Sequence, residues 1–217
     1  STAVSGNTNE STVTAVPARA ADEITIGGFN LLRFFDDVAD GNGATKLTTA
    51  AYQFRLKKTA NAICAFTRNP DILGVVEVEH IKALSELATS INSNQGNLLF
   101  PDACTGNPGY QAYLVEGNDV GGIDVGFLLK AEEVAPGKPR VEVLSIDQIG
   151  KDALFTNADN STELLNDRPP LVLVARINAA NGASQTVTVI ANHLRSLIDV
   201  NSTATGTIVS RATSDVT

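Results

Sequence analysis

The stretch 71–80 (Asp-Ile-Leu-Gly-Val-Val-Glu-Val-Glu-His) places the strongest constraint on how this chain can fold. Its centre is apolar, which is typical of a strand that is buried on both faces of a sheet. The stretch nevertheless ends in two carboxylates, Glu77 and Glu79, followed by His80. A buried carboxylate without a partner costs several kcal/mol, so these acids need a cation, a hydrogen-bond network or water. Because ligands usually bind at the carboxyl ends of strands in open α/β sheets, the pattern predicts either a ligand site here or simply the place where the strand reaches the surface.

Helical and extended segments alternate around this strand. Thr48 or Thr49 is a suitable N-cap for the first helix, which should stop before Asn69-Pro70 because the residue before a proline disfavours the helical conformation. A strand–helix–strand–helix order implies neighbouring parallel strands joined by right-handed crossovers. The first half of the chain is expected to contain, in order, a strand over 23–30, a helix over 49–67, the strand within 71–80 and a helix over 81–91.

The second half of the chain is expected to consist mainly of strands. A glycine-rich turn over 117–122 and the Asn181-Gly182 pair both indicate hairpins. The length suits a single domain over 22–217, preceded by a flexible lead-in or inter-domain linker over 1–21 and ending in a loop-like, Ser- and Thr-rich tail. The expected strands cover 110–116, 123–130, 140–149, 171–177 and 186–191.

Charge and composition limit the classes of function. The formal net charge is -8, which argues against a broad basic surface for polyanions. A phosphate-bearing substrate remains compatible, because a divalent cation held by carboxylates supplies positive charge locally. No apolar run approaches the ~20 residues of a membrane span. The chain starts at Ser1 without a leader pattern and has no methionine, which suggests a piece excised from a longer precursor.

The two cysteines, Cys64 and Cys104, are too few for a disulfide scaffold or a zinc cluster. They are compatible with one bridge in an oxidising compartment or with two buried thiols.

Polar side chains stand at several predicted strand ends. Asn30, Glu77 and His193 each follow an extended segment, and Arg168 is placed just before a strand by the stiff pair Pro169-Pro170. Each residue has an ordinary structural explanation as well, since a lone histidine is more often structural and an arginine can cap a loop.

Several segments of the chain together carry a resemblance to a known family. They are Ile26-Gly27-Gly28-Phe29-Asn30-Leu31, Arg55 with Pro70-Asp71-Ile72 and Glu77-Val78-Glu79, Asp124-Val125-Gly126-Phe127-Leu128-Leu129, Arg168-Pro169-Pro170-Leu171 and Asn192-His193-Leu194-Arg195-Ser196. With these segments the chain resembles the endonuclease/exonuclease/phosphatase superfamily, and within it the secreted bacterial nucleases related to pancreatic deoxyribonuclease. The resemblance runs from about Glu23 to Ser196, in the order and spacing of that family. It implies a two-sheet α/β sandwich with mixed sheets flanked by helices, in which strand ends form a metal-dependent phosphodiesterase site.

The resemblance also implies a role for each site residue. Glu77 would bind Mg²⁺, with Mn²⁺ or Ca²⁺ as alternatives, and Asn30 would position the metal or the scissile phosphate. His193 would contact the phosphate or transfer a proton, and Arg168 and Asn192 would hold the substrate. These roles suit the side chains, because magnesium prefers oxygen ligands and histidine transfers protons near neutral pH. The expected protein is a secreted monomer that acts on nucleic acid or another phosphodiester.

The chain departs from the family in one respect. The later Gly-Asp-x-Asn and Ser-Asp-His segments are missing, and Ser214-Asp215-Val216 does not replace the latter because it lacks the histidine. The expectation is therefore a parent nuclease of which this chain is a truncated catalytic domain with at most residual activity. The alternative is a non-catalytic binding or surface module with the same sandwich fold.

Overall fold

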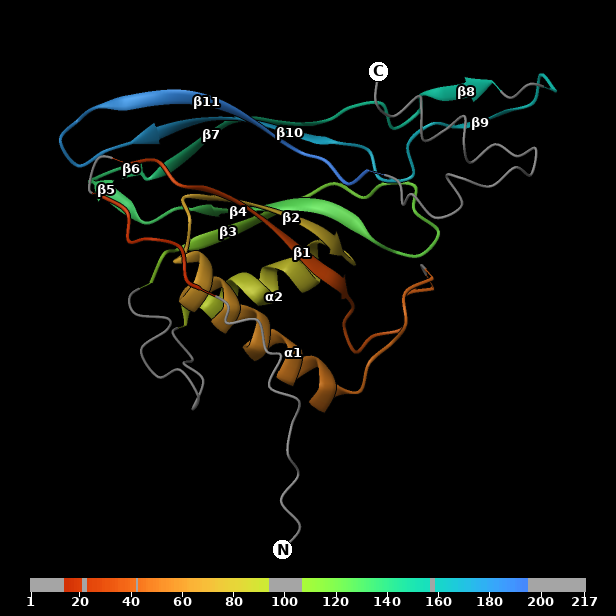
Figure 1. Ribbon diagram of the computed structural model, residues 1–217, viewed down its shortest axis with the longest axis horizontal. Coiled ribbons are helices and arrows are strands. Elements are labelled where there is room, and N and C mark those ends of the chain that lie inside the picture. Colours follow the sequence, from red (N-terminus) through yellow and green to blue (C-terminus); the bar gives the residue numbers. More distant parts are fainter. Residues whose placement is uncertain (1–13, 21–22, 42, 94–106, 157–158, 195–217) are drawn as a thin grey trace, which may run out of the picture.

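The computed structural model describes residues 14–20, 23–41, 43–93, 107–156 and 159–194, and these form three layers (Figure 1). A three-stranded sheet packs on a four-stranded sheet, and two helices cover the other face of the four-stranded sheet. The described residues are therefore a mixed α/β, strand-rich sandwich, which confirms the coarse fold prediction. Cys104, the tail 199–217 and most of the lead-in lie outside the described residues.

The four-stranded sheet has the order β1-β2-β4-β3. The predicted parallel pair is confirmed, because β1 (Ile26–Phe34) runs parallel to β2 (Ile72–Val78). The predicted hairpin is also confirmed: β3 (Tyr110–Leu114) and β4 (Asp124–Lys130) are antiparallel neighbours, and β4 is antiparallel to β2. The strand β2 therefore lies inside the sheet, as its apolar sequence predicts.

Both predicted helices are present, and each has a side-chain cap. Helix α1 (Thr49–Ala62) begins after Thr48, whose hydroxyl accepts a hydrogen bond from the Ala51 amide. It continues into the π-helical turn η1 (Ile63–Thr67), which ends before Pro70. Helix α2 (Ile81–Asn92) is capped by the His80 side chain. Cys64 in η1 is disulfide-bonded.

The three-stranded sheet has the order β11-β10-β7 and is antiparallel throughout. Its strands β7 (Val141–Gln148), β10 (Leu171–Asn178) and β11 (Ser184–Ala191) confirm the predicted strand and the hairpin around Asn181-Gly182. Two small hairpins were not predicted. They are formed by β5 (Glu133–Ala135) with β6 (Lys138–Pro139) and by β8 (Leu154–Thr156) with β9 (Thr162–Leu164).

The two faces of β2 belong to two hydrophobic cores. Leu73 and Val75 pack with the helices, whereas Ile72 packs with the three-stranded sheet. All three side chains are fully buried, so truncating any of them to alanine is expected to cost about 2–5 kcal/mol for the larger two and less for valine. In the described part of the chain no helix is long and apolar enough to cross a membrane.

The amino end of β2 carries a separate polar network around Asp71. The Asp71 carboxylate is fully buried and accepts hydrogen bonds from Arg19, Arg140 and the Thr25 amide. Arg19 belongs to the predicted lead-in, and Val16 in the same segment donates to the Phe66 carbonyl. Residues 14–20 are thus attached to the end of the sandwich that lies away from the polar strand ends.

Candidate functional site

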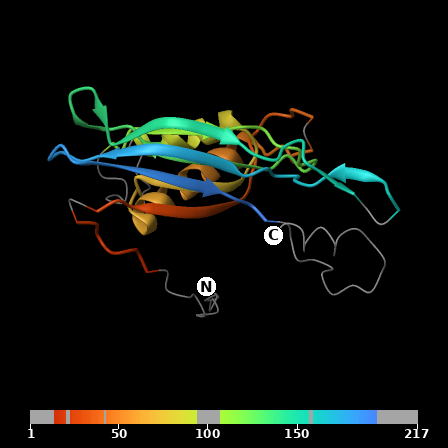
Figure 2. The same ribbon diagram turned by 90° about the horizontal axis from the view of Figure 1, so that it is seen from above.

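The predicted site residues lie near strand termini that are all at one end of the sandwich. Strands β1, β2 and β11 run toward the same end, on the right in Figures 1 and 2. Strands β4 and β10 are antiparallel to β2 and β11 respectively, so they begin there. Side chains that follow β2 and β11 can therefore meet those that precede β10, although they are far apart in the sequence.

A double irregularity in β1 and β2 turns Glu77 toward this end. The register slips between Asn30 and Phe34 in β1 and between Val76 and Val78 in β2. Glu77 has a φ of 61°, in the left-handed region. Regular alternation would send Glu77 toward the helices, as it does Leu73 and Val75, but the bulge places Val78 in that core instead.

The predicted position of Asn30 at the end of the first strand is wrong, because β1 continues past the irregularity to Phe34. The intervening Leu32 and Arg33 have φ values of 54° and 55°. Non-glycine residues in this conformation are costly, by about 1–3 kcal/mol each, and persist where the surrounding contacts hold them.

Glu77 is the centre of a hydrogen-bonded group. Its Oε1 accepts from Asn30 Nδ2 at 2.9 Å, and its Oε2 accepts from the Arg33 backbone amide at 3.0 Å. Asn30 Oδ1 in turn accepts from the Leu32 amide at 2.8 Å. His193 Nε2 lies 3.6 Å from Glu77 Oε1. The structure therefore brings together the three residues Asn30, Glu77 and His193 that the sequence singled out.

The environment of His193 favours a neutral ring. Burial and the positive charge of Arg168 lower the pKa of His193 below its usual value, and the negative charges of Glu77 and Asp119 only partly oppose this. The side chain is 18% exposed, and its buried Nδ1 has no hydrogen-bond partner among the described residues. At neutral pH this imidazole can accept or donate a proton.

Arg168 joins the group together with Asp119, a residue that the sequence analysis missed. Arg168 Nη1 lies 3.5 Å from Asp119 Oδ2. The turn that carries Asp119 is fastened to the segment before β10, because the Asn118 amide donates to the Asp167 carbonyl at 2.8 Å. A side chain at Gly117 would come within 2.9 Å of Pro169, so glycine permits this close approach. We define the strand-end site as Asn30, Glu77, Asp119, Arg168 and His193.

Asn192, the remaining predicted substrate residue, is exposed. It lies next to His193 after the end of β11, but its side chain is not part of the hydrogen-bonded group around Glu77.

Asp124 lies at the same end of the sheet, opposite Val78. Burial, a hydrogen bond with the Glu116 side chain and the Glu116 charge raise the pKa of Asp124 to about 7, against a lowering effect of the Gly117 amide that donates to its Oδ1 at 2.7 Å. A protonated Asp124 can donate to Glu116 while it accepts from Gly117, so the carboxyl closes the base of the turn that carries Asp119.

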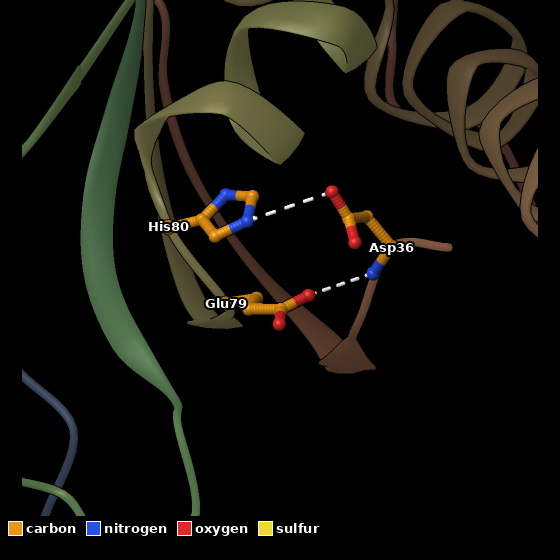
Figure 3. A group of neighbouring side chains, drawn as sticks. All are labelled: Asp36, Glu79 and His80. Atoms are coloured by element: carbon orange, nitrogen blue, oxygen red, sulfur yellow. Dashed lines mark hydrogen bonds and ion pairs between the residues drawn. The ribbon is translucent and has the colours of Figure 1, made fainter. Parts of the chain in front are cut away.

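A second group of potential metal ligands, Asp36, Glu79 and His80, lies beside the ends of β1 and β2 (Figure 3). Its candidate ligand atoms lie within 4.8 Å of one another, a spacing that could hold a metal ion.

The contacts of this second group favour a structural role. His80 Nδ1 accepts from the Ala83 amide at 3.1 Å, and Glu79 Oε2 accepts from the Asp36 amide at 2.7 Å. The Lys82 ammonium lies 2.8 Å from Asp36 Oδ2 and already supplies a cation. The group thereby connects the end of β1 to the end of β2 and the start of α2.

In the strand-end site Glu77 offers one carboxylate, 19% exposed, as a candidate oxygen ligand for a metal ion. Its Oε1 accepts from Asn30 and faces His193 Nε2, and its Oε2 accepts from the Arg33 amide. Magnesium commonly binds through one or two carboxylates, keeps several waters and uses substrate phosphate oxygens.

Comparisons of the chain with family models, with curated proteins and with solved structures gave no match.

Proposed function

We propose that this domain belongs to a metal-dependent phosphodiesterase and that the strand-end site is its catalytic centre. One observation carries the proposal: Asn30 on β1 of the four-stranded sheet and His193, which follows β11 of the three-stranded sheet, reach the same carboxylate, Glu77. A histidine with a lowered pKa beside a carboxylate at strand ends is typical of functional sites.

Each residue has a defined task in this proposal. Glu77 holds the metal, and Asn30 and the Arg33 amide fix the carboxylate in one orientation. Bound magnesium would polarise the phosphoryl oxygen and offset charge at the leaving oxygen. Arg168 binds a phosphate oxygen through its guanidinium, and neutral His193 accepts or donates a proton at Nε2.

The substrate class in this proposal is nucleic acid or another phosphodiester outside the cell. An acidic chain of net charge -8 must offset the substrate charge locally, and the metal together with Arg168 would do so. The disulfide bond of Cys64 supports secretion, because such bonds persist in oxidising compartments.

Hydrolysis assays test the proposal directly. The 217-residue chain is incubated with bis(p-nitrophenyl) phosphate, plasmid DNA or RNA, with Mg²⁺ or Mn²⁺ and with a chelator as the blank. We expect residual metal-dependent hydrolysis, in keeping with a truncated catalytic domain, that Glu77→Gln abolishes and that Glu142→Gln leaves unchanged. Glu142 is a matched control because it is a partly exposed carboxylate that pairs with Arg176 on the outer face of the other sheet.

Two outcomes would contradict the proposal. Hydrolysis that survives Glu77→Gln would place the chemistry elsewhere. Binding of DNA or RNA without hydrolysis, unaffected by the chelator and by Glu77→Gln, would favour the alternative of a non-catalytic binding module.

A further inference from the structure

Arg55 on α1 contacts the bulge of β1 directly beneath the strand-end site. Its Nη2 donates to the Leu31 carbonyl at 3.1 Å and also to the Leu32 carbonyl. Its guanidinium lies 5.6 Å from the centre of the Phe34 ring, at cation–π distance. In a bulge the extra residues leave the strand ladder, so their carbonyls need another donor, and Arg55 provides it.

The two peptide groups that Arg55 binds are the same groups that hold the site residues. In the Leu31–Leu32 peptide, the carbonyl accepts from Arg55 and the N–H donates to Asn30 Oδ1. In the Leu32–Arg33 peptide, the carbonyl accepts from Arg55 and the N–H donates to Glu77 Oε2. A peptide group is planar and rigid, so fixing its carbonyl also fixes the direction of its N–H.

We propose that Arg55 is a positioning residue for Asn30 and Glu77, acting on both through two consecutive peptide groups of the β1 bulge. Arg55 touches neither side chain. It holds Leu32 and Arg33 in left-handed conformations that are unfavourable for residues other than glycine. In this way it keeps the Leu32 N–H directed at Asn30 and the Arg33 N–H directed at Glu77. The inference that this alignment serves catalysis rests on the proposed function, whereas the alignment itself does not.

A planar guanidinium suits this task better than an ammonium. Both hydrogen bonds of Arg55 come from Nη2, whose two N–H groups have fixed directions in the guanidinium plane beside the Phe34 ring, whereas lysine carries a flexible point charge. Arg55→Lys keeps the positive charge and the apolar stem but loses the fixed directions of the two N–H groups. It should therefore restore only part of the alignment.

The test compares Arg55→Gln with Lys58→Gln in the full 217-residue chain. Lys58 is an exposed cation on the same helix, so the pair of variants matches in charge and in helix context. Three quantities are measured: hydrogen exchange of the Leu32 and Arg33 amides, Mn²⁺ affinity, and kcat and KM for bis(p-nitrophenyl) phosphate.

The proposal predicts a specific pattern for Arg55→Gln. The Arg33 and Leu32 amides should exchange about tenfold faster or more, while amides in the centre of β2 keep their protection. Mn²⁺ affinity should fall, by no more than the about 10- to 100-fold that follows loss of a direct hydrogen-bond partner of a metal ligand, because Arg55 acts on Glu77 through a peptide group. The decrease in activity should appear mainly in kcat, because binding of the substrate through Arg168 is unaffected. Arg55→Lys should lie between Arg55→Gln and the parent chain.

Parent-like exchange at Arg33 in Arg55→Gln, equal to that in Lys58→Gln, would overturn the proposal. If Arg55→Gln does not fold at the assay temperature, Arg55→Lys serves in its place, and its equality with Lys58→Gln has the same consequence. Failure of the proposed function is recognised separately: Glu77→Gln would then leave hydrolysis and Mn²⁺ affinity unchanged, while the exchange of the Arg33 amide would still report on Arg55.

Discussion

His193 Nε2 lies 3.6 Å from Glu77 Oε1, although Glu77 lies on β2 of the four-stranded sheet and His193 follows β11 of the three-stranded sheet. The pKa of His193 is lowered chiefly by burial and by Arg168, and Glu77 opposes this. We therefore expect opposite effects from two neutralising changes: Arg168→Gln raises the pKa of His193, and Glu77→Gln lowers it further. A metal-free NMR titration of the histidine ring protons measures both.

The assignment needs only one further variant, because the chain contains two histidines and His193→Gln removes one signal. Glu142→Gln is the control and should leave the His193 titration unchanged. Shifts of the same sign in Arg168→Gln and Glu77→Gln would show that His193 does not lie between these two charges.

Asp124 gives a prediction for the pH dependence of stability. Its pKa is raised to about 7 in the folded protein from 3.8, so the folded state retains a proton that the unfolded state has lost between these values. The stabilisation is fully present below about pH 4, falls as the pH rises toward about 7 and is constant above that. Asp124→Asn mimics the protonated carboxyl and does not titrate. The free energy of unfolding of the variant minus that of the parent chain should therefore rise by about 2–4 kcal/mol between acid and neutral pH.

Urea unfolding at a series of pH values measures this difference. Asp147→Asn, at an exposed carboxylate on β7, is the control and should show no such trend. A difference for Asp124→Asn that stays flat from about pH 4 to 8 would mean that the buried carboxyl is ionised throughout this range.

The sequence pattern predicts that Glu77 and His193 lie near strand ends, but it does not predict the bulge in β1 and β2. The extended segments that lead to Glu77 and His193 predict both residues near strand ends, but without the bulge Glu77 would face the helices. The left-handed residues Leu32, Arg33 and Glu77 could not be foreseen, because glycine and asparagine are the usual sequence signal for that conformation. The role of the Arg33 amide was missed for the same reason.

Asp119 was missed although a signal was present. It lies in a predicted hairpin turn, and an antiparallel strand after β2 must begin at the end where β2 finishes. That rule would have placed the turn beside Arg168. Nothing in the sequence indicates that Asp36 is fully buried next to His80, since that contact depends on how the loop after β1 folds back under the sheet.

Substitutions at His80 test whether a metal binds at Glu77 or in the Asp36–Glu79–His80 group. His80 caps α2 by accepting from the Ala83 amide, and asparagine is also a good N-cap whereas leucine is not. We expect His80→Leu to be less stable than His80→Asn by about 1 kcal/mol, measured by urea unfolding. Neither change should alter Mn²⁺ affinity, because Glu77 is the proposed ligand. Loss of Mn²⁺ binding in His80→Asn, with Glu77→Gln unaffected, would move the metal to the Asp36–Glu79–His80 group.

The strain in the β1 bulge should reverse the usual order of alanine and glycine. In an ordinary strand glycine is less stable than alanine by about 0.5–1 kcal/mol. Leu32 has a φ of 54° and is 70% exposed, so a smaller side chain loses little packing, and glycine avoids the steric cost of the left-handed conformation. Leu32→Gly should therefore be more stable than Leu32→Ala by about 1 kcal/mol. The same pair at Ile190, an exposed β11 residue with ordinary φ, should show the usual order. If alanine is the more stable residue at both positions, the bulge is not held in the left-handed conformation, and the alignment of Arg33 with Glu77 has another cause.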